Sequence, residues 1–207
     1  MLKKLPLIAI LAIGTLITSC SKDDDGTTDT SSNTGKNYLP ITTGNNWTYN
    51  GSTSYTTTVG GTSVIGGETY HAMSNSTSTS QSYVRKSGSE YLIVDQQGYG
   101  TLTPQVLLKE AAAQGDVWNW TLSVTNSGYT TVNEYQFSIY DKLSSLTVNG
   151  VTYNDVLVID LDLNTYFGGQ LYYTLNDSRY YYANNIGMIK AEITGSTPVN
   201  LVSYSVN

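Results

Sequence analysis

Few side chains in this sequence could carry out acid–base or nucleophilic catalysis. The single histidine, His71, follows Tyr70 in a strand-like run. No Gly-x-Ser-x-Gly segment supplies a nucleophile that this imidazole could activate. We therefore interpret His71 as an ordinary strand residue and predict that the protein is not an enzyme. A glycan-active enzyme stays open as an alternative, because the separation of two catalytic carboxylates is a tertiary property.

Residues with metal-binding chemistry are equally sparse. Asp160, Asp162 and Asn164 occupy alternate positions, as the first three ligands of a calcium-binding loop do. The glycine expected at the sixth position of such a loop is Thr165, and the glutamate expected at the twelfth is Leu171. One cysteine and one histidine are also too few for a zinc site with four such ligands. We predict no metal ion and no other cofactor.

The single cysteine, Cys20, follows an apolar segment near the N-terminus. Residues 1–4 include two lysines, and residues 5–17 are apolar apart from small residues. As a helix, residues 5–17 would be roughly 20 Å long, which is short of the roughly 30 Å hydrocarbon core of a bilayer. This pattern is typical of a secretory signal peptide. The following Ile-Thr-Ser-Cys resembles the bacterial lipobox, in which the cysteine sulfur accepts diacylglycerol. We expect cleavage after residue 19 and acyl chains such as palmitate on Cys20.

The residues after Cys20 contain no apolar side chain up to residue 37. Such a segment cannot contribute to a core, so we expect residues 20–37 to be the lipidated cysteine and a disordered polar tether. The segment begins with one basic and three acidic residues, Lys22, Asp23, Asp24 and Asp25. This run resembles the acidic export signal of surface lipoproteins in the Bacteroidota. The resemblance implies an outer-membrane lipoprotein facing the cell exterior. A plain acidic linker on a periplasmic protein is the alternative.

The charge balance bears on the choice of partner. The formal net charge is −6, from 10 basic and 16 acidic residues. Removing residues 1–19 takes away Lys3 and Lys4 and no acid, which leaves 8 basic and 16 acidic residues, or −8. A net acidic chain without a basic cluster repels phosphate backbones. We therefore expect no nucleic-acid partner.

Residues 38–207 have the pattern of an all-β domain. Short runs of β-branched and aromatic residues alternate with turn signals at roughly 8–12-residue spacing. Asn149-Gly150 is the clearest turn, because both residues tolerate the positive φ of a two-residue type I′ hairpin. We predict one antiparallel domain, built as a curved sheet or barrel of roughly ten or more strands. A β-sandwich is the alternative.

Two segments of this domain are less uniform. Residues 156–165 predict a long strand whose first half is apolar on both faces. Residues 104–114 are the only helix candidate, because Thr103 could cap the helix, Pro104 suits its first turn and Gly115 could end it. The apolar residues 106–108 fit a strand equally well, so both interpretations stay open.

Three short patterns recur in the same order in the two halves of the domain. They are Gly44-Asn-Asn-Trp47 with Gly115-Asp-Val-Trp118, Gly67-Glu-Thr69-Tyr70 with Gly150-Val-Thr152-Tyr153, and Tyr91 plus Gly98 with Tyr180 plus Gly187. We interpret them as two similar halves with Trp47 and Trp118 in the core. Coincidence in a chain rich in Gly, Tyr and Thr is the alternative.

The body also resembles a group of Bacteroidota lipoproteins without an assigned activity. The resemblance rests on an opening, Pro40-x-x-x-Gly44-x-x-Trp47-x-Tyr49, and an ending, Tyr182-Ala183-x-x-Ile186-Gly187-Met188-Ile189-Lys190. The chain departs from the pattern at Asn185, where the group carries glycine. The resemblance implies a curved antiparallel sheet or barrel and implies no catalytic activity.

Two functional interpretations therefore stand beside the enzyme. The first is a binding or assembly module that contacts a glycan or another envelope protein. The second is a carrier of a hydrophobic ligand in a half-open barrel. A core packed by Trp47, Trp118 and Trp120 would favour the first, and a hollow apolar cavity would favour the second.

A hairpin over residues 171–182 supplies the candidate contact surface. Turning at Asn176-Asp177, it would pair Tyr172 with Tyr181 and place Arg179 beside them on the solvent face. Tyrosine and arginine are favoured where binding energy concentrates. Tyr172, Arg179 and Tyr181 are therefore the predicted contact residues, with an ordinary solvated strand face as the alternative.

Overall fold

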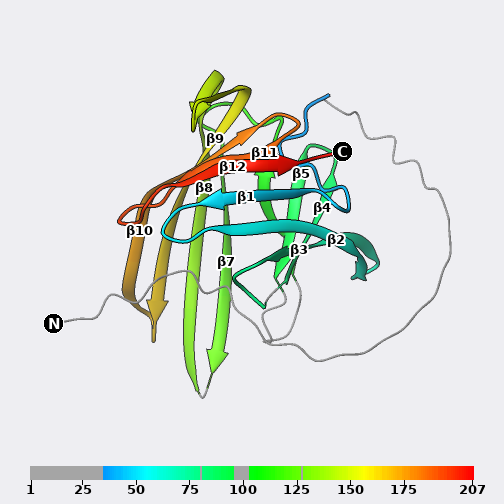
Figure 1. The fold of residues 1–207 in the computed structure, drawn as a ribbon. Coiled ribbons are helices and arrows are strands. Elements are labelled where there is room, and N and C mark those ends of the chain that lie inside the picture. Colours follow the sequence, from blue (N-terminus) through cyan, green and yellow to red (C-terminus); the bar gives the residue numbers. More distant parts are fainter. Residues whose placement is uncertain (1–34, 80, 96–102, 127) are drawn as a thin grey trace.

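The computed structural model describes residues 35–79, 81–95, 103–126 and 128–207, and these residues form twelve β-strands (Figure 1). The strands are β1 (Asn46–Asn50), β2 (Tyr55–Ile65), β3 (Glu68–Asn75), β4 (Gln81–Ser87), β5 (Glu90–Asp95), β6 (Gln105–Lys109), β7 (Val117–Asn126), β8 (Tyr129–Val148), β9 (Val151–Phe167), β10 (Gln170–Ala183), β11 (Gly187–Glu192) and β12 (Val199–Ser205). Within the described residues, no helix is long and apolar enough to cross a membrane.

All twelve strands belong to one antiparallel sheet. Its order is β6-β5-β4-β3-β2-β1-β12-β11-β10-β9-β8-β7. The sheet therefore consists of two consecutive six-stranded meanders joined by the pairing of β1 with β12. It curls until it is nearly closed into a barrel, with the seam between β6 and β7 (Figure 1). This arrangement confirms the predicted single all-β sheet rather than the sandwich.

The helix candidate at residues 104–114 is wrong. Its first half is strand β6, which pairs with β5 through Tyr91 opposite Leu108. Leu108 is fully buried there, while its neighbours are more exposed. A strand was favoured because β5 both pairs with the backbone of this segment and covers Leu108, whereas a helix would have left the edge of β5 unpaired.

The meanders correspond in two of the three repeated patterns. Trp47 lies in β1 and Trp118 in β7, which are the first strands of the two meanders. Tyr70 and Tyr153 both follow the turn into a third strand, β3 or β9. The third match fails, because Tyr91 lies in the fifth strand of its meander and Tyr180 in the fourth. Both tryptophans are buried as predicted, with exposed fractions of 1% and 8%.

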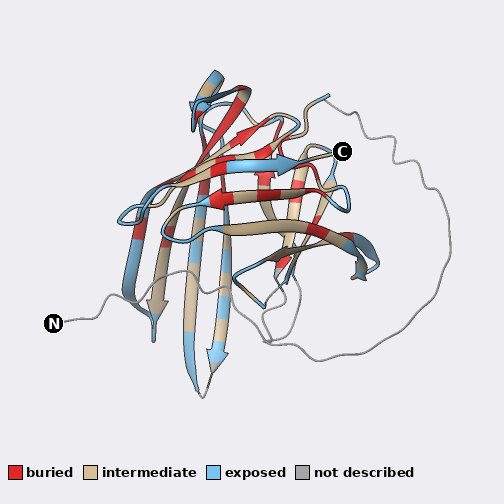
Figure 2. Cartoon of the chain, viewed as in Figure 1, coloured by how far each residue is buried: buried red, intermediate tan, exposed pale blue. Residues whose placement is uncertain are grey.

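Strand β9 is covered on both faces over its first half, as predicted. Leu157 and Ile159 pack into one core cluster with Tyr182. Val156 and Val158, which point to the other face, pack into a second cluster with Ala183. Figure 2 shows that the buried residues gather in the upper part of the barrel, while the lower ends of β7–β10 are exposed or only partly buried. The core therefore occupies one end of the long strands.

The predicted turn at Asn149-Gly150 joins β8 to β9. Both residues have positive φ, 51° and 80°, as a type I′ turn requires. The Asn149 Nδ2 donates a hydrogen bond to the Leu201 carbonyl at 2.9 Å, which ties the hairpin end to β12. On either side of the turn, Val148 and Tyr153 are buried, while Val151 is half exposed.

Candidate functional site

The predicted lipidation and export residues lie outside the described residues. These are Cys20, Lys22, Asp23, Asp24 and Asp25. Their roles stay predictions. The last two residues of the predicted tether, Lys36 and Asn37, contact the barrel, and residues 20–34 of it lie outside the described residues.

The predicted hairpin at residues 171–182 is wrong, because Gln170–Ala183 is one strand, β10. Leu175 pairs with Leu163 and Ser178 with Leu161, so Asn176 and Asp177 form a bulge in β10 instead of a turn. Asp177 has a φ of 58° and its N–H donates to Asp162 Oδ1 at 3.0 Å. The same residue types serve a tight turn and a bulge, since both need positive φ.

The absence of this turn separates Tyr172 from the other two predicted contact residues. Tyr181 pairs with Val158 and Lys190 instead of Tyr172. Seven residues of strand place Tyr172 roughly 20 Å from Arg179. Tyr172 is nevertheless exposed, with 79% of its surface accessible.

The apolar side chains of this segment differ in burial. Leu175 and Tyr182 are buried, while Leu171 and Tyr173 are exposed. Leu171 and Tyr173 lie on the part of β10 that runs past the end of the core. Side chains still alternate between the two faces there, but no apolar layer covers them.

Arg179 of β10 lies instead against Tyr140 of β8, with β9 between the two strands. The Arg179 Cζ is 3.9 Å from the centroid of the Tyr140 ring, which is a close cation–π contact. Tyr140 is the extra residue of a bulge between Ile139 and Asp141, and this bulge directs its ring toward Arg179. Tyr140 is 47% exposed, so the stacked pair borders the solvent.

Charged residues of β11 extend this surface. The Tyr181 hydroxyl donates to Glu192 Oε2 at 2.6 Å, and Lys190 forms an ion pair with Glu192. Lys190 also lies 5.3 Å from the Tyr181 ring centroid. Burial, followed by the hydrogen bond to Glu192, raises the pKa of Tyr181 well above its ordinary value, so its hydroxyl stays protonated. We name this surface the Arg179 ledge, and its members are Tyr140, Arg179, Tyr181, Lys190 and Glu192.

A polar groove lies beside the ledge on the same face of the sheet. Its volume is about 370 Å³. Asn119, Gln136 and Asp162 are cross-strand neighbours along one row, and the next row carries Glu134 and Asn164. The remaining lining residues are Trp120, Thr121, Tyr135 and Asn176. Amides, hydroxyls and carboxylates therefore line the groove, and no lysine or arginine does.

The ledge and the groove meet at Asp160. Asp160 is the cross-strand partner of Arg179, and its Oδ1 lies 3.6 Å from the Arg179 Nε. Asp162, two residues further along β9, points to the same face and lines the groove. Burial raises the pKa of Asp160, and Arg179 offsets this only in part. Asp160, Asp162 and Asn164, which resemble the start of a calcium-binding loop in sequence, thus lie on one face of a strand.

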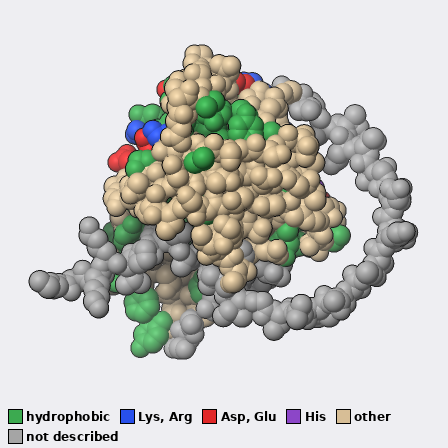
Figure 3. Space-filling view, viewed as in Figure 1, with side chains coloured by type: hydrophobic (Ala, Val, Ile, Leu, Met, Phe, Trp, Pro, Cys, Tyr) green, Lys and Arg blue, Asp and Glu red, His purple; other side chains and the backbone are tan. Residues whose placement is uncertain are grey.

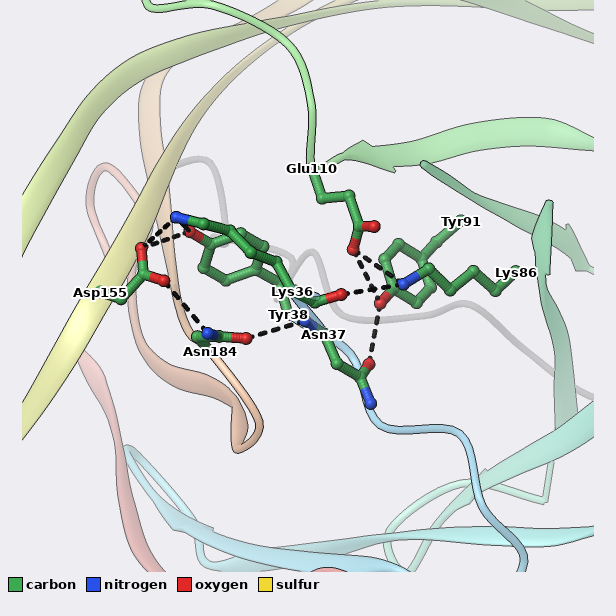
Figure 4. Close-up of polar contacts among 8 residues, drawn as sticks. All are labelled: Lys36, Asn37, Tyr38, Lys86, Tyr91, Glu110, Asp155 and Asn184. Carbon is green, nitrogen blue, oxygen red and sulfur yellow. Dashed lines mark hydrogen bonds and ion pairs between the residues drawn. The ribbon is translucent and has the colours of Figure 1, made fainter. Parts of the chain in front are cut away.

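A second polar site lies at the opposite, core-containing end of the barrel. Residues 35–41, which we name the strap, cross this end before β1 begins (Figure 4). Lys36 forms an ion pair with Asp155 at 2.8 Å, and the Tyr38 hydroxyl donates to the same carboxylate at 2.6 Å. The Asn37 N–H donates to Asn184 Oδ1 at 2.8 Å. These contacts tie the strap to the second meander.

The strap is tied equally to the first meander. Lys86 Nζ donates to the Lys36 carbonyl at 3.0 Å and to Glu110 Oε2 at 2.9 Å. The Tyr91 hydroxyl donates to Asn37 Oδ1 at 2.8 Å (Figure 4). The carboxylate of Glu110 is buried, so its ion pair with Lys86 offsets the cost of removing the charge from water. The strap therefore links β4–β6 to β9 and β10.

The charge states of the strap residues follow from the Asp155 carboxylate, which Lys36 and Tyr38 both contact. Burial, followed by the hydrogen bond to Asp155, raises the pKa of Tyr38 to about 12. Burial opposes ionisation of Asp155, but hydrogen bonds from Lys36 and Tyr38 hold its pKa below the ordinary value. At neutral pH, Lys36 and Asp155 are therefore charged, and the Tyr38 hydroxyl that contacts them is neutral.

His71 lies in β3, as predicted, and lines a cavity beside the strap. The cavity has a volume of about 480 Å³ and is also lined by Lys36, Asn37, Lys86 and Asn185. Burial lowers the pKa of His71, so the imidazole is neutral at pH 7. Both lysines already hold carboxylates, which leaves this cavity without a free cation among its described lining residues. Within the described residues, no three Asp, Glu, His or Cys side chains come together as a metal site.

Comparison with known proteins adds little to this geometry. No family model matches the chain, and no curated protein matches it. The chain is similar to a crystal structure from Parabacteroides distasonis of a protein described as a "putative lipoprotein". The two are 14% identical, the alignment covers 81% of this chain and 98% of that one, and the TM-score is 0.43. At this level the likeness indicates no function for the chain.

Proposed function

We propose that this protein is a cell-envelope lipoprotein whose β-domain is a non-catalytic binding module. Acyl chains on Cys20 would hold it at the outer membrane, and the acidic run after Cys20 would place it on the exterior. The observation that supports binding is the Arg179 guanidinium stacked on the exposed Tyr140 ring beside the polar groove. This pair holds a flat amphipathic surface in place before any ligand arrives, which reduces the entropy lost on binding.

A neutral glycan is the ligand that suits this surface best. Sugar hydroxyls both donate and accept hydrogen bonds, and the amides of Asn119, Gln136 and Asn164 can do the same. The carbon face of a sugar ring can pack on an aromatic ring such as that of Tyr140. Because Glu134 and Asp162 line the groove without a neighbouring cation in its lining, an acidic glycan would be repelled.

The hydrophobic-ligand carrier receives less support. It requires a hollow apolar interior, but Trp118 is a buried member of the first core cluster, Trp120 packs against that cluster, and Trp47 is buried in the second. Trp118 stacks on Phe137 with ring centroids 5.5 Å apart, and Trp120 stacks on Tyr135 at 3.9 Å. Aromatic side chains thus fill the space that a lipid would occupy in a carrier.

Glycan binding can be tested with residues 21–207, which contain every residue of both core clusters. A glycan array would identify the ligand, and titration calorimetry would give the affinity. We expect Arg179→Ala and Tyr140→Ala each to weaken binding roughly tenfold, the loss expected of a cation–π contact that also orders the surface. An envelope protein captured at the ledge instead of a glycan would redirect the proposal to that partner.

Arg85→Ala is the matched control. Arg85 lies on β4, with its Cζ 5.4 Å from the Tyr70 ring centroid, so it is the same pairing elsewhere on the sheet. Its replacement should leave glycan affinity unchanged. Equal affinity of the Arg179→Ala variant and the wild type, with unchanged circular dichroism, would show that the ledge is not the binding surface.

A further inference from the structure

Two hairpin ends carry exposed apolar side chains at the end of the molecule that the core does not reach. Tyr129 begins β8, Phe167 ends β9, and Leu171 and Tyr172 begin β10. Their exposed fractions are 63%, 47%, 58% and 79%, respectively. We name these four residues the tip cluster. Figure 3 shows hydrophobic side chains standing out from the ends of the long strands at the lower left.

The tip cluster lies at one end of the sheet, because the two hairpins are joined. Thr131 of β8 pairs with Phe167 of β9, so β7–β10 continue as a four-stranded sheet to their ends. The Tyr129 and Phe167 rings, one from each hairpin, stack with centroids 5.5 Å apart. The Gly168 N–H donates to the Thr130 carbonyl at 3.2 Å, which binds the two ends together. The apolar side chains therefore stand at the same end of the sheet, with Phe167 and Leu171 on opposite faces, because Phe167 pairs with Gln170 and Leu171 with Tyr166.

Charge is absent from both hairpin ends. No Asp, Glu, Lys or Arg occurs between Asp116 and Glu134, or between Asp162 and Asp177. No charged side chain therefore has to leave water when the two hairpin ends enter an apolar layer. The polar residues that remain are Thr, Ser, Asn and Gln, whose side chains can hydrogen-bond to lipid headgroups without the cost of burying a charge.

We propose that the tip cluster inserts into the interfacial region of a lipid bilayer. Tyrosine is enriched at the level of the headgroups, while phenylalanine and leucine are favoured in the apolar layer just below. The cluster is convex, so a fluid bilayer can close around it, whereas a protein partner would need a matching groove. This contact goes beyond the proposed glycan binding and uses none of the ledge residues.

The contact is also separate from the lipid anchor. The strap holds Asp155, and twelve residues of β9 separate Asp155 from Phe167, a distance of roughly 40 Å. The fifteen residues between Cys20 and Lys36 can span at most about 50 Å. This reach exceeds the distance along β9, so a domain anchored through Cys20 can turn its tip cluster toward the same bilayer.

Vesicle binding by residues 21–207 tests the proposal directly. The probe is a large unilamellar vesicle of phosphatidylethanolamine and phosphatidylglycerol, and co-sedimentation measures the bound fraction. We expect the double variant Phe167→Ser/Leu171→Ser to weaken binding at least tenfold. Binding should change little between 50 and 500 mM salt, because no charge lies in the contact. Phe167→Trp should show a blue-shifted emission with vesicles that brominated acyl chains quench.

The control removes equally exposed apolar residues from other turns. Val64→Ser/Val151→Ser replaces side chains that are 74% and 51% exposed at the β2–β3 and β8–β9 turns. This variant should bind vesicles as the wild type does. Failure of the wild type to bind, or equal binding by the tip variant, would overturn the proposal. A dimer in sedimentation velocity that the tip variant abolishes, without vesicle binding, would assign the cluster to a second copy and also overturn it.

Discussion

The indole N–H of Trp118 in β7 donates a hydrogen bond to the carbonyl of Val106 in β6, at 2.9 Å. These strands stand at the two ends of the sheet order, so this side chain bridges the seam where the backbone ladder stops. Lys109 of β6 also lies 5.7 Å from the Trp118 ring centroid. One residue thus closes the barrel by packing, a hydrogen bond and a cation contact.

Replacing Trp118 should therefore open the seam. We expect Trp118→Ala to cost roughly 3–5 kcal/mol of unfolding free energy, the range for a large buried aromatic. Trp118→Phe keeps much of the packing but loses the donor, so it should cost about 1–3 kcal/mol. Urea unfolding followed by circular dichroism measures both. A loss below about 1 kcal/mol for the alanine variant would show that the seam does not depend on this residue.

Gly187 should be intolerant of any side chain. It has a φ of 107°, and a Cβ there would lie 3.0 Å from the Trp47 Nε1. Gly187→Ala should therefore displace Trp47 as well as strain the backbone. Gly195→Ala is the control, because Gly195 has a positive φ of 79° but open space around it. We expect Gly187→Ala to lose at least about 1 kcal/mol more on urea unfolding; equal losses would contradict the close approach.

The strap should make stability depend on acid pH through Asp155. Its pKa in the folded protein lies below the ordinary value of 3.8. Stability from this group is therefore fully present above that value and is lost as the pH falls through the lowered folded pKa. Asp155→Asn should lower stability at pH 7 and flatten the fall between about pH 5 and pH 2. Asp141→Asn, on β8 outside the strap network, is the control variant.

Lipidation should depend on Cys20. We expect Cys20→Ala to abolish incorporation of labelled palmitate, because no other residue of the chain supplies a thiol at the predicted cleavage site. The protein should then be retained uncleaved or released in soluble form. Incorporation at the wild-type level would contradict the lipobox interpretation.

Exposure on the cell should depend on the acidic run. Replacing Asp23, Asp24 and Asp25 by Ala should leave palmitate labelling intact but protect the domain from protease added to whole cells. Replacing Asp29 alone, further along the tether, is the control and should leave the domain accessible. A wild type that resists protease on intact cells but is cleaved after lysis would place the domain in the periplasm.

Local patterns predicted the fold better than the site. The alternation of apolar residues, the Asn149-Gly150 turn and the apolar start of β9 depend on neighbours in sequence, and all three are present. Asn176-Asp177 was misread because positive φ serves a turn and a bulge alike, and only the partner strand distinguishes them. The register of β9 and β10 is a tertiary property.

The contacts that build the site are long-range, and that is why sequence reasoning missed them. Arg179 and Tyr140 are far apart in the chain and meet only because a bulge in β8 turns Tyr140 toward β10. Lys36 and Asp155 are 119 residues apart. No periodicity relates such pairs, since each residue alone looks like a solvated polar or aromatic side chain.

If the proposed lipid anchor holds the domain by its N-terminus, the strap has a mechanical consequence. Any force applied through the tether first reaches Lys36, Asn37 and Tyr38. Because these residues are hydrogen-bonded to both meanders, several contacts share the load. The strands are therefore not detached one at a time. A tethered domain that meets shear at the cell surface would thus resist unravelling from the very end by which it is held.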